Sequence, residues 1–406
     1  MAGPHIIVLD PHNAGLALAR RMLRLGTRVT MILEPNEPFF ARSRGVGSVI
    51  TPFGPTGEPW VQALLRIAQS SGECMALTAT DRGSELLIRA RERLPENLRS
   101  FEHQGSAHLA LMDKEAAERI ARRAAVNVPW TACADSLQEL EPILDGAPWP
   151  CVVKPIFSHE WRARYGETRA FLAQDAAAAA GLMRQPLKDG LGMMLSQYIP
   201  GEDTDVEEAI VVRLADGSYP VSFGCRKLRQ YPPGFGVTSL GEASPLPETM
   251  SLARRVLDQA GFVGVAGVET KRDAETGEFW FLEVNVRLPG QWGLGDTCGV
   301  QATPRLIAAL AGQELGPQPP LRAGTRFVHP DVDWHVVVPA LHAAPVKRRP
   351  ALAWRLLRPY LGTRDFGLFD WRDPAPALAF CGVFLRRRLV SLAGRVRFWR
   401  RPRSAG

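Results

Sequence analysis

Short apolar runs alternate with amphipathic stretches near the start of the chain. Ile6–Leu9 is a continuous apolar run, which is typical of a strand buried on both faces, and Val29–Leu33 is expected to be the next strand. Over Leu16–Leu25, apolar residues recur at helical spacing, and Gly26 follows as a helix-ending residue. The same strand-and-helix pattern continues over Met75–Leu94. This pattern predicts an open parallel α/β domain at the N-terminus.

The middle of the chain changes to a different pattern. Helical stretches over Lys114–Ala125 and Ala176–Ala180 flank a short β-type run, Cys151–Pro155. Beyond residue 190, β-type runs alternate with Gly/Pro turns, and Asp216-Gly217 is a hairpin signal. The expected strands are Met194–Ile199, Ile210–Leu214, Val221–Gly224, Val263–Thr270 and Phe279–Val284. We therefore expect an antiparallel sheet here, followed by a linker at Gly316–Pro320.

Composition excludes several classes of protein. Apolar residues make up 46% and charged residues 22% of the chain, as in ordinary globular proteins. No apolar run is long enough to span a bilayer, and no signal-peptide pattern precedes the first strand. The six cysteines form no CxxC pair, which argues against a disulfide framework and a cysteine zinc site. We expect a cytoplasmic protein with reduced thiols.

The basic charge is concentrated in the C-terminal extension. From Lys347 to Gly406 there are fifteen Lys/Arg and three Asp, a balance of +12 in a chain whose net charge is +7. An apolar stripe at helical spacing lies among these arginines: Leu385, Leu389, Leu392, Val396 and Trp399. A basic amphipathic helix of this type can lie on the inner membrane surface as a peripheral contact. The favoured alternative is that the stripe packs on the protein's own body. Nucleic acid is not favoured, because aromatic residues are few and no binding motif is present. A homodimer stays open.

Four short segments carry the candidate chemistry. They are Asp113-Lys114, Val152-Val153-Lys154-Pro155, Ser196 to Asp203 (SQYIPGED), and the pair Val268-Glu269-Thr270-Lys271 and Leu282 to Arg287 (LEVNVR). In the last segment, Glu283, Asn285 and Arg287 share one face of a strand, since side chains alternate with period two. Each segment alone has an ordinary interpretation as a solvated surface.

In this order and spacing, the segments resemble the ATP-grasp superfamily. The motifs cover Asp113 to Arg287, and the architecture covers about residues 1–315. The string from Arg226 to Gly236 (RKLRQYPPGFG) is similar to bacterial carboxylate–amine ligases of the subgroup that contains D-aspartate ligases. The resemblance implies a mixed α/β and α+β fold in four parts. They are an open α/β domain (1–110), a small lid (111–198), an antiparallel platform (199–318) and the basic extension (319–406).

The resemblance also implies which residues bind ATP. Lys114 and Lys154 match the two lysines that contact phosphates, where lysine acts as a compact positive charge. The strand at 197–199 matches the hinge whose backbone contacts adenine, and Asp203 matches the acid that binds the ribose. The expected cofactor-binding residues are Lys114, Lys154, Ser158, Gln197, Tyr198, Ile199 and Asp203.

A second set is expected at the reacting phosphate. Glu269, Glu283 and Asn285 match the family's metal ligands, and oxygen donors suit Mg²⁺ or Mn²⁺. Arg287 is expected to face the γ-phosphate or an acyl phosphate, where a guanidinium stabilises developing charge. Lys227 and Arg229 are expected to line the acceptor or phosphate side, with a purely structural loop as the alternative.

Two stretches depart from the family pattern. The flap from Ser158 to Gly166 contains one glycine, so it would close on ATP through side chains. The turn Asp10-Pro11-His12-Asn13 replaces a glycine-rich turn, and the missing GxGxxG argues against NAD binding.

We expect an ATP-dependent ligase that joins a small-molecule carboxylate to an amine through an acyl phosphate, releasing ADP and phosphate. Two alternatives remain open. One is an ATP-dependent carboxylase or carbamoyl-phosphate-type enzyme, and the other is a non-catalytic nucleotide-binding, membrane-associated protein. Neither the carboxylate nor the amine is evident from the residues.

Overall fold

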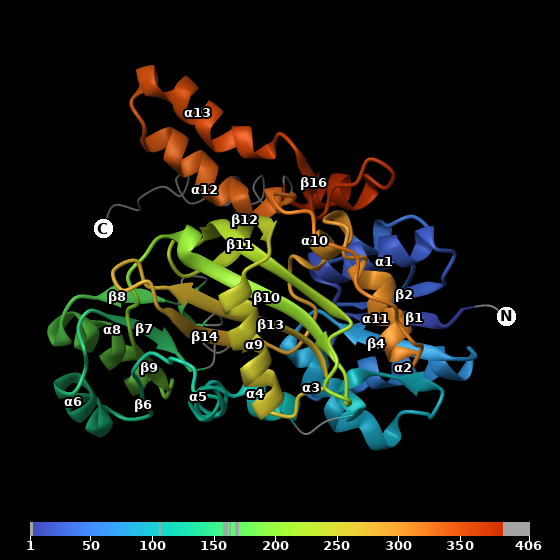
Figure 1. Ribbon diagram of the computed structural model, residues 1–406, viewed down its shortest axis with the longest axis horizontal. Coiled ribbons are helices and arrows are strands. Elements are labelled where there is room, and N and C mark those ends of the chain that lie inside the picture. The colour runs from blue at the N-terminus through green and yellow to red at the C-terminus, as the bar shows by residue number, and fades with distance from the viewer. Residues whose placement is uncertain (1–2, 105–106, 157–160, 162–163, 167–169, 385–406) are drawn as a thin grey trace, which may run out of the picture. The chain divides into compact units, whose positions relative to one another are not determined.

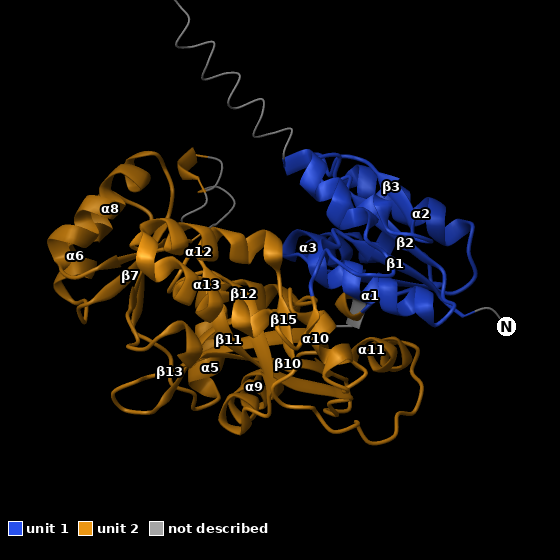
Figure 2. Ribbon diagram, turned by 90° about the horizontal axis from the view of Figure 1, so that it is seen from above, with its two compact units in different colours: residues 1–100, 366–406 blue, residues 101–365 orange. Residues whose placement is uncertain are grey.

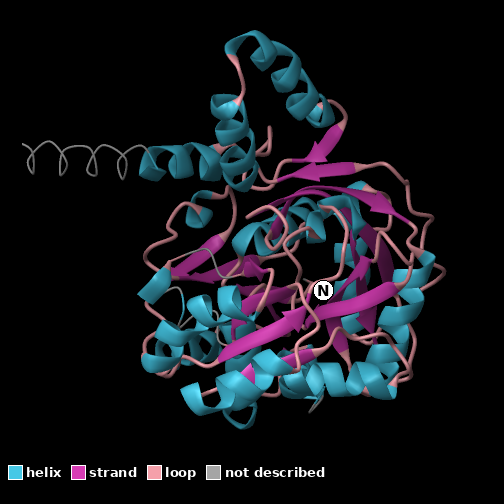
Figure 3. Ribbon diagram, turned by 90° about the vertical axis from the view of Figure 1, so that its left-hand side faces the viewer, coloured by secondary structure: helices cyan, strands magenta, loops and turns pink. Residues whose placement is uncertain are grey.

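The computed structural model describes residues 3–104, 107–156, 161, 164–166 and 170–384. The chain divides into two compact units (Figure 2). Unit 1 comprises residues 1–100 together with the chain from residue 366 onward, and unit 2 comprises residues 101–365. Residues 319–365 thus belong to unit 2, and the segment after 318 is not a separate unit. Helices flank the sheets in both units (Figure 3).

Unit 1 contains a five-stranded parallel sheet in the order β3-β2-β1-β4-β5 (Figure 1). The strands are β1 (His5–Leu9), β2 (Val29–Leu33), β3 (Gly47–Ile50), β4 (Cys74–Thr78) and β5 (Leu98–Arg99). The connecting helices are α1 (His12–Arg24), η1 (Phe40–Arg42), α2 (Glu58–Gln69), α3 (Asp81–Ala90) and η2 (Arg91–Arg93). All five residues of β1 are buried, as its continuous apolar run predicts. The expected open parallel domain is confirmed.

The chain returns to unit 1 at its far end. Arg20 on α1 is 6% exposed, and its guanidinium donates to the carboxylate of Asp373 and to the carbonyls of Gly367 and Leu368. The hydroxyl of Ser43 also donates to Asp373, at 2.6 Å. These buried contacts fasten residues 367–373 to the N-terminal helix. No sequence pattern indicated this pairing.

The lid of unit 2 has a four-stranded antiparallel sheet in the order β6-β9-β7-β8. Its elements are β6 (Thr131–Ala134), α6 (Leu137–Asp145), β7 (Cys151–Pro155), β8 (Phe171–Ala173), α8 (Ala176–Lys188) and β9 (Met193–Gln197). A core that includes Val153, Trp161, Met183 and Leu195 joins the sheet to its helices. The run at 194–199 therefore forms part of the lid sheet, and not of the larger antiparallel sheet.

The platform of unit 2 is a seven-stranded sheet in the order β14-β13-β10-β11-β12-β15-β16. Its strands are β10 (Val206–Arg213), β11 (Val221–Tyr231), β12 (Val237–Ser244), β13 (Gly264–Arg272), β14 (Phe279–Asn285), β15 (Arg326–Val328) and β16 (Thr363–Asp365). All neighbours are antiparallel except β15 and β16. One face packs on α9 through a core that contains Val211, Val256, Phe262 and Val268.

The remaining helices of unit 2 surround this platform. They are η3 (Phe101–Gln104), α4 (Ala107–Met112), α5 (Lys114–Arg123), η4 (Asp203–Asp205), α9 (Pro247–Gln259), α10 (Trp292–Thr297), α11 (Ala302–Leu310), α12 (Pro330–Ala343), η5 (Val346–Arg348), α13 (Arg349–Leu357) and η6 (Arg358–Tyr360). The expected linker is fixed in place, because the side chain of Gln318 bonds both backbone groups of Ser222 at 2.7 Å. None of the helices in the described part of the chain has the length and apolar character needed to traverse a membrane.

Candidate active site

Three glutamates lie in a row across neighbouring platform strands. In the antiparallel register, Glu208 of β10 is opposite Glu269 of β13, and Glu269 is opposite Glu283 of β14. Directly opposed residues share one face of a sheet, so the three side chains rise from the same side. The neighbouring Gly267 leaves room for them, because a Cβ there would lie 2.1 Å from Oε1 of Glu208. Like charges this close need compensation.

Lys227 of β11 supplies part of that compensation. Its side chain is 3% exposed, and Nζ lies 2.8 Å from Oε2 of Glu269. The same ammonium donates to the side-chain oxygen of Gln230 at 3.4 Å and to the carbonyl of Gly236 at 3.3 Å. Burial opposes the charge of Lys227, but Glu269 outweighs it and raises the pKa of the lysine. Lys227 therefore stays charged beneath the carboxylates.

The three carboxyls differ in their tendency to ionise. Burial raises the pKa of Glu208 well above its usual value, and Glu269 adds to the effect. Burial also raises the pKa of Glu269, against the attraction of Lys227. For Glu283, desolvation is outweighed by Lys114, Lys227 and Lys154, which lower its pKa. Glu208 therefore holds its proton more tightly than Glu283 does.

Asn285 and Arg287 extend the row along the chain from Glu283. The amide of Asn285 donates to Oε1 of Glu283 at 3.3 Å, and its carbonyl oxygen accepts from Nη2 of Arg287 at 2.9 Å. Two carboxylates and an amide oxygen are the donors that Mg²⁺ prefers. The donor chemistry of Glu269, Glu283 and Asn285 thus fits a Mg²⁺ ion. If Mg²⁺ bound here, Asn285 and Lys227 would each have to leave a present hydrogen-bond partner.

Lys114 and Lys154 act electrostatically on this row; Lys154 lies on the lid strand β7, whereas Lys114 begins α5, which packs on the platform core. Lys114 is the first residue of α5, whose N-cap Asp113 accepts from the amide of Ala116 at 2.7 Å. Nζ of Lys114 lies 3.5 Å from the carbonyl oxygen of Ile156, just beyond β7. Lys154 comes from β7 itself. Both lower the pKa of Glu283, so lid and platform charges meet at one place in unit 2.

The expected adenine hinge is the end of β9. The amide of Gln197 donates to the carbonyl of Trp130 at 2.8 Å, and that of Tyr198 to the carbonyl of Pro150 at 3.0 Å. Among the residues that the structure describes, no acceptor bonds the amide of Ile199. Lys271 lies 4.8 Å above the ring of Tyr198. A backbone amide that follows the end of a strand can donate a hydrogen bond to the edge of a base.

Asp203 holds a loop in the present structure. Its Oδ1 accepts from the side chain of Gln230 at 2.7 Å and from the amide of Gly234 at 3.0 Å. The same loop has no room for a side chain at Gly236, because a Cβ there would lie 2.0 Å from the carbonyl carbon of Tyr231. The distinctive 226–236 string therefore builds a tight turn that fixes Lys227. A ribose would have to use the remaining oxygen of Asp203.

Arg229 is held away from the glutamate row. It forms a two-point ion pair with Asp333 on α12, with Nε–Oδ1 2.9 Å and Nη2–Oδ2 2.6 Å. It also donates to the carbonyl of Leu356 at 2.9 Å. The structure thus brings Lys227 to the carboxylates and directs Arg229 to the C-terminal helices. Ser158 lies outside the described residues.

Glu208 is the residue that sequence reasoning missed. It stands on the strand β10 and is 2% exposed. A signal was available, because an acid at alternate positions from Ile210 and Val212 must share their buried face. The neighbouring Glu207 masks that signal. It points to the other face, where it accepts from Thr249 at 2.7 Å.

No protein-family profile matches the chain, and no curated protein is similar enough to be matched. Solved structures do match. An ADP complex of purK, an N5-carboxyaminoimidazole ribonucleotide synthetase, superposes with a TM-score of 0.63 at 15% identity, covering 80% of this chain and 81% of that one. Biotin carboxylase from Campylobacter jejuni gives 0.60 at 12% identity, with coverage of 79% and 74%.

L-amino acid ligase from Bacillus licheniformis gives a TM-score of 0.58 at 16% identity, covering 79% of each chain. At such identities the likeness concerns the fold. The order of lid and platform, with the parallel sheet of unit 1, agrees with the architecture expected from the motifs. The chain therefore has the ATP-grasp fold.

Proposed function

We propose that this protein is an ATP-dependent carboxylate–amine ligase that works through an acyl phosphate. The observation that carries the proposal is the meeting of Glu269 and Glu283 with the lysines of α5 and β7 and with Arg287 in unit 2. Phosphoryl transfer needs positioning and neutralisation of phosphate charge more than covalent catalysis. A row of acids faced by lysines and an arginine supplies both.

Each residue has a part in this reaction. Glu269, Glu283 and Asn285 would hold Mg²⁺, whose charge would offset that of the ATP phosphates. Lys114 and Lys154 add positive charge, and the 197–199 strand binds the adenine. Arg287 stabilises the charge that develops when a substrate carboxylate oxygen attacks the γ-phosphorus and ADP leaves. An amine then attacks the acyl carbon, and phosphate leaves as the amide forms.

The structural neighbours leave the activated acid open. One neighbour is an L-amino acid ligase, and two others are a biotin carboxylase and an N5-carboxyaminoimidazole ribonucleotide synthetase. The carboxylase alternative predicts bicarbonate as the activated acid. The 226–236 string and its resemblance to carboxylate–amine ligases favour an organic carboxylate and an amine. A non-catalytic binder would not need the combination of Glu269, Glu283, Asn285 and Arg287.

The test is a screen of phosphate release with ATP and Mg²⁺ over amino acids and small peptides, alone and in pairs. We expect release only when a carboxylate and an amine are both present. Hydroxylamine should replace the amine and yield a hydroxamate of the activated acid. Release with bicarbonate alone would favour the carboxylase alternative, and nucleotide binding without any release would favour the non-catalytic one.

A further inference from the structure

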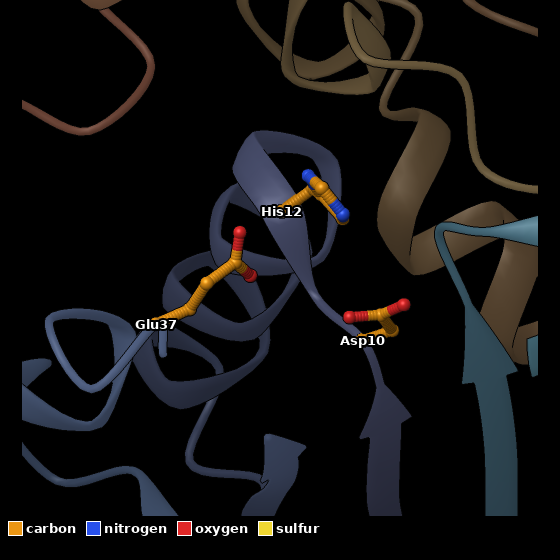
Figure 4. A group of neighbouring side chains, drawn as sticks. All are labelled: Asp10, His12 and Glu37. Carbon is orange, nitrogen blue, oxygen red and sulfur yellow. The ribbon is translucent and has the colours of Figure 1, made fainter. Parts of the chain in front are cut away.

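Three side chains that can bind a metal converge at the carboxyl end of β1 in unit 1 (Figure 4). Asp10 follows β1, His12 begins α1, and Glu37 lies in the loop after β2. One ligand atom from each of them lies within 4.8 Å of the other two. The strand order of the parallel sheet reverses between β1 and β4, beside Asp10, and Glu37 approaches from the loop after β2 on the other side of β1. Open α/β sheets bind ligands at such a point.

The three groups approach one another without bonding directly. In the described part of unit 1, neither the His12 ring nitrogens nor the Glu37 carboxylate make a hydrogen bond or ion pair. Asp10 is buried, and its Oδ2 accepts from Oγ1 of Thr80 at 2.8 Å and Nε of Arg82 at 2.6 Å. Its other oxygen is left for a ligand. A metal bound at about 2.1 Å holds its ligand atoms about 3–3.5 Å apart. If the exposed side chain of His12 moved about an ångström closer to the other two, the three ligand atoms would approach this spacing.

The surroundings carry excess negative charge. Among the residues that the structure describes, Arg82 bonds both Asp10 and Glu34 and is the guanidinium paired with this group of three carboxylates, Asp10, Glu34 and Glu37. Three carboxylates against one guanidinium leave two negative charges. A divalent cation would balance them.

The backbone here takes a conformation that glycine would adopt at less cost. The φ angles of Asp10 and His12 are +48° and +44°, in the left-handed region. Asp and His are among the side chains that tolerate this region best. The chain thus has two left-handed residues that carry full side chains at this turn. Backbone geometry alone does not require either side chain.

We propose that Asp10, His12 and Glu37 form a binding site for a first-row transition-metal dication such as Co²⁺ or Zn²⁺. One imidazole nitrogen with two carboxylate oxygens suits these ions, whereas Mg²⁺ prefers oxygen ligands alone. Thr80 and Arg82 orient Asp10 from behind, as outer partners of metal ligands do. The site shares no residue with the glutamate row of unit 2.

The experiment is titration of chelator-treated full-length protein with Co²⁺, followed by calorimetry and by the visible absorption of the bound ion. We expect His12→Gly to lose one equivalent of bound Co²⁺, or to weaken it at least about tenfold. Its melting temperature should stay level or rise, because glycine relieves the left-handed backbone. Glu37→Gln should show the same loss of Co²⁺, and it removes no hydrogen bond of the described structure.

Two controls make the result specific. Ala125→Gly also replaces a left-handed residue, with φ +54°, and should leave Co²⁺ binding unchanged. Glu283→Gln alters the glutamate row of unit 2 and should keep the unit 1 equivalent. The proposal is overturned if His12→Gly and Glu37→Gln bind Co²⁺ with the stoichiometry and affinity of the wild type. It is also overturned if the wild type binds no equivalent that depends on these residues.

Discussion

The guanidinium of Arg229 and the carboxylate of Asp333 form a two-point ion pair whose acid has no exposed surface. Asp333 also accepts from the hydroxyls of Ser239 and Tyr360, both at 2.7 Å. This arrangement ties β11 to α12. It indicates that Arg229 serves the architecture of the platform, which was the alternative to a role beside the substrate.

The first prediction is that Arg229→Met destabilises the protein. Removing one partner of a buried ion pair leaves an uncompensated charge, which costs about 3–5 kcal/mol. Thermal unfolding followed by circular dichroism measures the effect. Arg226→Met is the matched control, because Arg226 lies on the same strand as Arg229 and pairs with Glu207 of β10, but its own side chain is 38% exposed. If Arg229→Met melts like the wild type and loses only activity, the architectural role is wrong.

The second prediction is that Glu208→Gln raises stability and lowers activity. The pKa of Glu208 is raised in the folded state, so above about pH 4.3 the unfolded chain binds fewer protons than the folded one. Stability of the wild type therefore falls as pH rises from that point. Glutamine keeps the shape without the charge, so it should raise the melting temperature at neutral pH.

The pH dependence is the check on this assignment. The two proteins should melt together near pH 4 and diverge towards pH 8, both without nucleotide or metal. Turnover with ATP and Mg²⁺ should fall in the variant, because glutamine cannot ionise beside a bound cation as the glutamate can. A gain in stability that is equal at every pH would contradict the assignment.

The third prediction concerns Glu283→Gln. Loss of one anionic ligand should reduce ADP production at least about 100-fold, because even outer partners of a metal typically contribute 10–100-fold. The fold should persist, since Glu283 keeps accessible surface and glutamine has the same shape. Glu278→Gln, an exposed change just before β14, is the control. Wild-type ADP production in Mg²⁺ would show that the metal assignment is incorrect.

The fourth prediction is that Lys154→Ala weakens ATP binding while the melting temperature of the free protein changes little. A hydrogen bond to a charged group contributes about 1.5–3 kcal/mol, so the Kd should rise roughly 10- to 150-fold. Calorimetry with ATP measures it. Arg184→Ala, on the lid helix α8 and paired only at the surface with Glu141, should leave the Kd unchanged. Equal affinity in both variants would remove Lys154 from the site.

The fifth prediction concerns the basic segment beyond residue 384, which lies outside the described residues. A chain ending at Phe384 keeps the Arg20–Asp373 pair and the edge contact of Phe380 with Phe39. If the segment packs on the body, this truncation lowers the melting temperature, and the full-length protein does not bind vesicles. If it binds lipid, full-length protein sediments with phosphatidylserine vesicles at low salt, at about 1 kcal/mol per basic residue.

The truncated chain distinguishes a further source of lipid binding. Residues 346–364 contain six Lys/Arg and no acid, and Trp354 is 62% exposed. Residual salt-sensitive binding after truncation would come from this α13 region. Substitution of Trp354 by alanine in the truncated chain would then abolish the remainder.

Local patterns were sufficient to predict much of the fold. The buried strands β1, β2 and β7 are uninterrupted or nearly uninterrupted apolar runs, and they were predicted within a residue of their observed bounds. β9 was identified as a strand but assigned to the wrong sheet. Strand propensity does not encode which strands pair, because pairing depends on contacts between residues far apart in the sequence.

The site was harder to predict, for a similar reason. Glu269 and Glu283 stand in recognisable strings, whereas Glu208 becomes visible as a neighbour only through the register of β10 and β13. Lys227 and Arg229 are two residues apart, yet a bulge between their pairings with β12 separates their environments. Irregularities of one residue in a sheet leave no periodic signal in the sequence.

The buried contacts of Arg20 with residues 367–373 determine the order in which this molecule can be completed during synthesis. All of unit 2 lies between the two pieces of unit 1. At about 5–20 residues per second, the ribosome supplies Asp373 on the order of tens of seconds after the sheet of unit 1 has been made. During that interval the guanidinium of Arg20 lacks its final acceptors. Unit 2 can therefore reach its native state first, while the earliest part of the chain to be translated is the last to be finished.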